Sequence, residues 1–244
     1  LKNKQGQLYI DHVRGIYNVM KRVKANYPDV PMMLCSGGGA RCDYEALKYF
    51  TEFWCSDNTD PVERIYIQWG FSQFFPAKAM DAHVTSWNKA TSVKFRTDVA
   101  SMCKLGFDIG LKELTADELT YCQTAVANWK RLQNAIMDGD QYRLVSPYEG
   151  NHMALNYVSK DANKAVLFAY DIHPRFQEKL LAVKLQGLDP NKQYKVEEIN
   201  LMPAASSGLV ANGKVYSGDY LMKIGLDVFG LGQTQSRVVE LTVQ

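Results

Sequence analysis

The sequence reads PMMLCSGGGARCD at residues 31–43, a short apolar run that stops at three consecutive glycines. The run shows no helical period, which is typical of a buried strand that feeds a flexible loop. Upstream, apolar residues recur at spacings of three and four from Leu8 to Tyr27, which predicts an amphipathic helix that ends before Pro28. The pattern around the glycines is therefore helix, strand and loop.

The alternation of helix and strand continues downstream of the glycines. Asp60, Pro61 and Glu63 predict a helix start, since Asp60 can cap the helix, Pro61 suits its first position and Glu63 would complete a capping box. Thr115 and Glu118 form the same signal for a long helix. The expected helices span residues 44–53, 61–75 and 116–137, with a further helix somewhere within 93–104. The further strands span 53–55, 79–84 and 105–111. The inner face of the last helix is expected to consist of Leu119, Cys122, Val126, Trp129, Leu132 and Ile136.

Four strands that alternate with helices predict an α/β domain with a parallel sheet covered by helices. A complete eight-stranded (β/α)8 TIM barrel needs about 250 residues. Residues 1–145 hold only four such strands, so they fit the second half of a barrel.

Residues 146–244 predict a separate all-β domain, an antiparallel β-sandwich. Turn signals separate its short alternating segments, and Asn212-Gly213 favours a two-residue hairpin. The expected strands, counting one at the boundary, span residues 141–145, 153–158, 164–170, 179–185, 194–199, 220–228 and 238–243.

Composition excludes disordered and fibrous proteins. Among 244 residues, 46% are hydrophobic and 22% charged, as in ordinary globular chains, and the net charge is only +2 without a basic block. We therefore expect neither nucleic acid nor a membrane surface as a partner. The five cysteines form no CxxC pair, which argues against a zinc site and a disulfide framework. No metal and no organic cofactor are expected.

Ligands of parallel α/β folds bind at the carboxyl ends of the strands. Asp57 follows one predicted strand and His83 ends another, but a lone Asp in a turn or a single His is more often structural. Asp60 is better explained as a helix cap. The glycines suit either a tight turn or a phosphate ligand, although neither GxGxxG nor GxxxxGK[ST] is present.

The ordered motifs together are more specific. CSGGGARCD at residues 35–43, WCSDNTD at 54–60 and AHV at 82–84 resemble glycoside hydrolase family 36, the family of microbial α-galactosidases. The likeness continues through RIYIQWG at 64–70, GFD at 106–108 and YRL at 142–144, and weakly through YSGDYLM at 216–222. Two positions depart from the family pattern, Cys42 where an aromatic is usual and Pro61 where Ala is common.

The resemblance implies a retaining glycosidase in which Asp57 is the general acid/base. The family's nucleophilic Asp lies in a WDxN-like segment after the fourth barrel strand, which this sequence lacks. We therefore expect a fragment, with the nucleophile upstream and the chain alone inactive. By the same resemblance, substrate-binding residues are Cys35, Ser36, Gly37, Gly38, Arg41 and Trp54. Two of them have competing structural explanations, because Arg41 can pair with Asp43 and Trp54 can pack against the barrel wall.

Several alternatives stay open at this point. The expected partner is a galactose-containing oligosaccharide such as raffinose or melibiose, while the same scaffold also supports α-N-acetylgalactosaminidases and galactosyl transferases. A non-catalytic carbohydrate-binding or interaction module is a second hypothesis, and a phosphate-binding domain built on Gly37–Gly39 is a third. An open barrel edge would favour association, so a homo-oligomer is also expected. The cellular compartment is left open.

Overall fold

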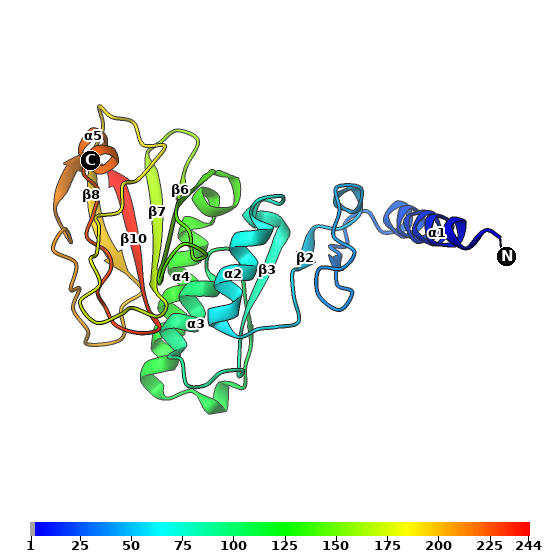
Figure 1. Cartoon of the computed structure of the whole chain (residues 1–244), viewed down its shortest axis with the longest axis horizontal. Coiled ribbons are helices and arrows are strands. Elements are labelled where there is room, and N and C mark those ends of the chain that lie inside the picture. The colour runs from blue at the N-terminus through cyan, green and yellow to red at the C-terminus, as the bar shows by residue number, and fades with distance from the viewer. Residues whose placement is uncertain (1–2) are drawn as a thin grey trace. The chain divides into compact units, whose positions relative to one another are not determined.

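A computed structural model describes residues 3–244, which divide into two compact units on either side of the Asp57–Asn58 bond (Figure 1). The first unit contains helix α1 (Gln5–Asn26), strand β1 (Met33–Leu34), a 3-10 turn (Ala46–Lys48) and strand β2 (Glu52–Trp54). Strands β1 and β2 are parallel, with Leu34 opposite Phe53. The first predicted helix and both predicted strands are thus confirmed, although the strands are short.

The expected helix over residues 44–53 is wrong, because only the turn Ala46–Lys48 forms. Asp43 accepts a hydrogen bond from the backbone N–H of Ala46 at 2.8 Å and so starts the turn. Only a few residues later, the N–H of Thr51 donates to the carbonyl of Met32 at 2.9 Å. That bond draws the chain into β2 beside β1 and leaves no room for a longer helix.

The second unit opens with the remaining barrel elements. These are α2 (Pro61–Phe71), a 3-10 turn (Ala77–Ala79), β3 (Met80–Thr85), α3 (Val93–Ala100), β4 (Lys104–Asp108), a 3-10 turn (Leu111–Glu113) and α4 (Ala116–Asp138). Strands β3 and β4 are parallel and paired from Asp81 and Lys104 to Thr85 and Asp108. The predicted strand and helix order of this segment is confirmed.

The predicted helix caps are confirmed in all but one detail. Thr115 and Glu118 form the reciprocal capping box at the start of α4. Asp60 caps α2 by accepting from the backbone N–H groups of Val62 and Glu63. The reciprocal bond expected from Glu63 is replaced, because the N–H of Asp60 donates to Asn58 Oδ1 at 3.0 Å.

The buried face of α4 differs from the predicted stripe. Leu119 is 37% exposed, whereas Tyr121 and Ala125 are fully buried. The helix contacts β4 on one side and β6 and β7 of the C-terminal sheet on another. Because two layers cover it, its buried surface is not one stripe. The buried residues of α4 are Tyr121, Cys122, Ala125, Leu132, Ala135 and Ile136.

The C-terminal part contains one six-stranded antiparallel sheet with the order β5-β6-β7-β10-β8-β9. Its strands are β5 (Asp140–Val145), β6 (His152–Val158), β7 (Lys164–Asp171), β8 (Gln193–Ile199), β9 (Val215–Ser217) and β10 (Gln235–Val243). One face of the sheet is covered by irregular segments that contribute Val183, Leu185, Leu209 and Leu226 to a shared apolar core. These segments form the second layer of the β domain.

Three sequence predictions fail in this layer. Residues 179–185 and 220–228 are not strands and share only an isolated bridge between Val183 and Leu226. Part of the second range is helix α5 (Gly218–Lys223), because the Ser217 hydroxyl caps it by accepting from the N–H of Tyr220. The two-residue hairpin is also wrong, since residues 200–214 separate β8 from β9.

The opposite face of the sheet packs against the barrel helices of the same unit, and Figure 1 shows α3 and α4 beside β6, β7 and β10. Tyr157 and Tyr170 reach across this interface, donating to the carbonyls of Met102 at 2.8 Å and Asp98 at 2.7 Å. The Asp98 carboxylate is fully buried and accepts from several donors. They are Lys94 at 2.5 Å, Tyr121 at 3.0 Å, Asn200 at 3.0 Å and Ser236 at 2.7 Å.

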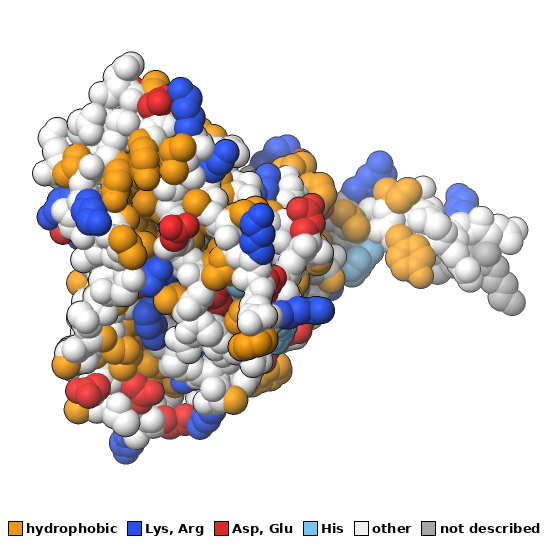
Figure 2. Space-filling view, turned by 60° about the vertical axis from the view of Figure 1, so that its left-hand side comes forward, with side chains coloured by type: hydrophobic (Ala, Val, Ile, Leu, Met, Phe, Trp, Pro, Cys, Tyr) orange, Lys and Arg blue, Asp and Glu red, His pale blue; other side chains and the backbone are white. Residues whose placement is uncertain are grey.

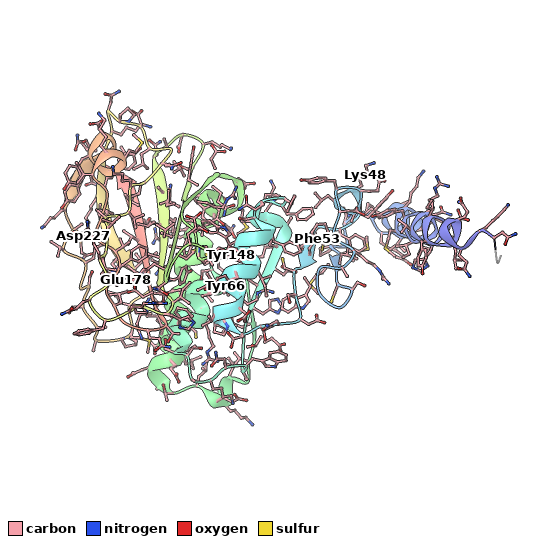
Figure 3. The ribbon with its side chains drawn as sticks, viewed as in Figure 1. Lys48, Phe53, Tyr66, Tyr148, Glu178 and Asp227 are labelled. Atoms are coloured by element: carbon pink, nitrogen blue, oxygen red, sulfur yellow. The ribbon has the colours of Figure 1, made fainter. Side chains whose placement is uncertain are left out.

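A second contact lies nearer the surface of this unit. The rings of Tyr66, on α2, and Tyr148, after β5, meet edge to face with centroids 5.3 Å apart (Figure 3). On the face that Figure 2 shows, positive and negative side chains are scattered among uncharged and hydrophobic groups. That mixture agrees with the small net charge of +2.

Candidate active site

Asp57 follows β2 and lies exposed at the end of the first unit. The indole Nε1–H of Trp54 donates to Asp57 Oδ1 at 3.0 Å. The exposed Cys35 places its Sγ 4.0 Å from the same oxygen. Residues after β1 and β2 therefore meet at the carboxyl ends of the two strands, as expected for the site of a parallel fold.

The glycine loop supports the backbone around Asp57. Gly38 is buried with φ +80°, and a Cβ there would lie 2.8 Å from Ser56 Cα and 3.2 Å from the Asp57 nitrogen. Gly37 also has a positive φ of +58°, but a Cβ there would meet no atom of the described residues within 4 Å. The two glycines thus differ, because Gly38 permits close packing of two backbones while Gly37 faces open space.

Backbone N–H groups of this loop already donate within the chain. Ser36 N–H donates to the carbonyl of Gly38, and Gly39 N–H donates to the carbonyl of Cys55, each at 3.0 Å. These bonds hold the loop against the end of β2. They also remove two of the donors that a phosphate-binding loop would need, which weakens the phosphate hypothesis.

Arg41 does not pair with Asp43, so that structural explanation is wrong. Asp43 instead accepts from the N–H of Ala46 and from the Tyr17 hydroxyl. Burial and the hydrogen bond to Asp43 raise the pKa of Tyr17 above its usual value. The exposed Arg41 side chain borders a cavity of about 170 Å³ that Tyr17 and Asp43 also line. Arg41 is therefore free of the partner that would have explained it structurally.

Cys42, which departs from the family pattern, lies in the same loop and is partly buried. Burial, with a contribution from the negative charge of Asp43, raises the pKa of its thiol to about 11. The thiol is consequently protonated at neutral pH and is a poor nucleophile.

Asp60, in the second unit, is occupied by structural contacts. Its carboxylate accepts from Val62 N–H at 2.8 Å, Glu63 N–H at 3.2 Å and Asn88 Nδ2 at 2.5 Å. The predicted capping role is confirmed. Of the two carboxylates in the SDNTD segment, Asp60 caps α2, whereas Asp57 does not bond to a helix terminus.

His83 packs closely against Gly106 on the paired strand β4. A Cβ at Gly106 would lie 2.3 Å from His83 Cδ2, so only glycine fits there. Burial lowers the pKa of His83 below its usual value, Arg64 lowers it further, and Asp108 opposes the shift. The lowered pKa favours the neutral imidazole, and the half-buried His83 side chain also lines a small cavity.

The sequence reasoning missed one contact at the site. Trp54 was expected to touch substrate or the barrel wall, yet its indole N–H bonds directly to Asp57. The two residues are three positions apart, and β2 ends between them. That spacing was visible in the sequence, but the chain path after the strand was not.

Within residues 3–244, no group of three or more His, Cys, Asp or Glu side chains is arranged to hold a metal ion. In the same range, no helix has both the length and the apolar character needed to cross a bilayer.

Short parallel strand pairs alternate with helices and are followed by an antiparallel β domain, an arrangement that fits part of a (β/α)8 barrel with a C-terminal β domain. The family model described as Melibiase matches residues 1–139, and the model of the glycosyl hydrolase family 36 C-terminal domain matches residues 152–241. The chain belongs to the glycoside hydrolase family 36 melibiases.

Named relatives agree with this assignment. The chain is 33% identical to alpha-galactosidase 2 of Hypocrea jecorina over 96% of its own length. The crystal structure of the α-galactosidase AgaB of Geobacillus stearothermophilus covers 94% of the chain at 33% identity with a TM-score of 0.84. The structure of a doubly substituted variant of AgaA from the same organism, in complex with raffinose, covers 94% of the chain at 31% identity, again with a TM-score of 0.84.

The chain spans about a third of these proteins. It covers 30% of the Hypocrea enzyme and 31% of each Geobacillus structure. The expected fold, the second half of a barrel followed by a C-terminal antiparallel domain, is confirmed by these likenesses.

Proposed function

We propose that this chain is the acid/base half of a retaining α-galactosidase that releases terminal α-linked galactose from oligosaccharides. The observation that carries the proposal is Asp57, held by Trp54 at 3.0 Å beside an exposed thiol and a loop with open space at Gly37. The names of the relatives support the activity, and the raffinose complex of AgaA supports the substrate class.

Asp57 is the general acid/base in this proposal. It donates a proton to the departing glycosidic oxygen and later removes a proton from the water that hydrolyses the covalent intermediate. The Trp54 bond occupies Oδ1, so Oδ2 is the oxygen that exchanges protons with substrate. Asp57 is exposed in this chain and does not cap a helix, so Oδ2 is accessible to a substrate.

The sugar is proposed to lie against the loop after β1. Cys35 and Gly37 are small, and Gly37 has open space where a side chain would extend, so a ring can approach the backbone there. Ser36 and Arg41 offer a hydroxyl and a guanidinium for sugar hydroxyls. Gly38 contributes indirectly, because it fixes the backbone of Ser56 and Asp57.

The second carboxylate, the nucleophile, is proposed to come from polypeptide outside these 244 residues. Retaining hydrolysis requires two carboxyl groups about 5 to 5.5 Å apart. The sequence has no WDxN-like segment, and the chain spans about 30% of its relatives. The isolated 244-residue chain should therefore not hydrolyse a chromogenic α-galactoside.

The experiment compares the isolated chain with the protein expressed together with the upstream sequence that its gene encodes. The longer protein should release galactose from raffinose and melibiose, and Asp57→Asn should lower release from both by about 10²- to 10⁴-fold. A longer protein that binds these sugars without cleaving them would favour the non-catalytic binding module. Preference for an N-acetylgalactosaminide, or transfer of galactose to an acceptor, would select the related activities of the same scaffold.

A further inference from the structure

Arg96 of α3 carries a charge into the interior of the second unit, and within residues 3–244 it forms no ion pair with an acidic side chain. Its side chain is 8% exposed, and its Nη1 donates to the carbonyl of Thr85 at 2.7 Å. Its buried Nε–H has no hydrogen-bond partner among residues 3–244. Burial lowers the pKa of Arg96, and the charges of Glu118 and Glu113 only oppose that shift. A buried cation with an unsatisfied N–H is costly unless something else binds it.

The Arg96 side chain lines a small cavity between α2, α3 and the carboxyl end of β3. The cavity holds about 10 Å³, which is roughly the space of one water-sized occupant. A phosphate, a carboxylate ligand or a sugar is too large. The cavity therefore has room for only one atom or small molecule that could accept a hydrogen bond from Arg96 Nε–H.

The other polar groups around the cavity are mostly donors or are already oriented by neighbours. Arg64, which is 3% exposed, also lines it and donates to Gln68 Oε1 at 3.2 Å and to the carbonyl of Asp81 at 2.6 Å. Thr59 accepts from the Thr85 hydroxyl at 2.9 Å, so the hydrogen of its own hydroxyl can serve as a donor.

The charge balance selects the kind of occupant. Two guanidinium groups line the cavity, and none of the described lining residues is acidic. The positive charges lie in a buried, low-dielectric region, where an anion gains far more than it would in water. A neutral water molecule could accept one hydrogen bond but would bring no negative charge next to the two guanidinium groups.

We propose that this cavity binds one small inorganic anion, chloride, through the Nε–H of Arg96 and the hydroxyl of Thr59. Thr59 of the SDNTD segment and Thr85 at the end of β3 both line this site. Chloride there stabilises the contacts among α2, α3 and β3, and the inference is independent of the proposed glycosidase activity.

Thermal unfolding tests the proposal in the protein expressed with the flanking sequence that its gene encodes. Sodium chloride is compared with sodium gluconate at constant ionic strength, because gluconate is too large for the cavity. The melting temperature should rise with chloride and saturate, as mass action requires. Arg96→Gln should abolish that rise, and Thr59→Val should weaken chloride about tenfold. The matched control is Arg14→Gln, whose arginine side chain is 74% exposed and which should keep the full chloride response.

A second measurement does not depend on the variants folding. Crystals of the unaltered protein grown with sodium bromide should show an anomalous peak within hydrogen-bonding distance of Arg96 Nε. Equal melting temperatures in chloride and gluconate, together with no anomalous peak and a water molecule at that position, would overturn the proposal.

Discussion

Alanine at Gly38 and at Gly37 should have different consequences, although both residues have positive φ. The conformational cost of placing a side chain in the left-handed region is about 1–2 kcal/mol and is shared by both substitutions. Only Gly38→Ala adds a collision, because its Cβ would lie 2.8 Å from Ser56 Cα and 3.2 Å from the Asp57 nitrogen. Ordinary contact with Ser56 Cα needs more than half an ångström of extra distance, so the backbone of Ser56 and Asp57, which follows β2, must move.

The extra cost of Gly38→Ala follows from that displacement. Overpacking of a close contact typically costs about 1–3 kcal/mol, so Gly38→Ala should destabilise by that amount more than Gly37→Ala. Because the atoms that move belong to Ser56 and Asp57, catalysis by the longer protein should fall as well. A shift of the acid by about 1 Å can cost on the order of 100-fold in rate.

The assay is denaturant unfolding of both variants, combined with kcat/KM for an unactivated α-galactoside measured on the folded fraction. Gly37→Ala should retain a near-normal catalytic constant unless the added methyl group blocks the sugar, which would appear as a raised KM. Equal losses of stability and of kcat for the two variants would refute the assignment of Gly38 to backbone packing at Asp57.

Three further predictions concern individual side chains. Trp54→Phe removes the hydrogen bond to Asp57 but keeps an aromatic ring. The value of kcat/KM for a poorly activated galactoside should fall about tenfold, and the loss for an activated galactoside should be smaller. If the ratio of the two kcat/KM values stayed unchanged, the bond would not position the acid. Asp60→Ala should lower the free energy of unfolding by about 0.5–2 kcal/mol through loss of the α2 cap, as chemical denaturation would measure, with activity kept by the folded molecules. Hydrogen bonds from Ser159 and Asn163 lower the pKa of Asp161 from 3.8 to about 2, so the ionised carboxylate stabilises the fold above about pH 4 and loses this effect as the pH falls toward 2. The difference in melting temperature between the unaltered protein and Asp161→Ala should therefore shrink from about pH 4 to about pH 2. A difference that stays constant over that interval would contradict this prediction.

The barrel half of the chain was predictable because its signals are local. Asp60, Thr115 and their neighbours define helix starts through short-range hydrogen bonds, and the structure contains those caps. Periodicity located β3, β4 and α4 to within a few residues. What it missed was the burial of Tyr121 on α4, because the helix is covered by layers whose strands lie far apart in sequence.

The β domain was less predictable because tertiary contacts decide its second layer. Residues 179–185 and 220–228 have the apolar content of strands, yet Val183 and Leu226 pair only through an isolated bridge. Their side chains enter the same apolar core that a strand would supply. The Ser217 cap then favours helix α5 over extended chain. Alternation of apolar residues does not distinguish these outcomes.

The candidate site could be located but not assembled from the sequence. The motifs singled out Asp57, Cys35 and Trp54, and the structure brings their side chains together. The bond from Trp54 to Asp57 depends on how the chain turns after β2, and the contact of Gly38 with Ser56 depends on the approach of two separate loops. Neither follows from residue types alone.

We propose Asp57 as the general acid/base of a retaining mechanism. In the longer protein, Asp57→Ala should cut the hydrolysis of poorly activated galactosides by about 10²- to 10⁴-fold. Azide needs no base, so it should attack the covalent intermediate and restore turnover of a substrate with a good leaving group.

The configuration of the azide product is the most direct measurement. If Asp57 is the acid/base, the nucleophile on the opposite face is intact, azide attacks from the face that Asp57 served, and nuclear magnetic resonance should identify the product as α-galactosyl azide. If Asp57 were the nucleophile, azide would occupy its place and displace the leaving group directly. The product would then be β-galactosyl azide, which would rule out Asp57 as the acid/base.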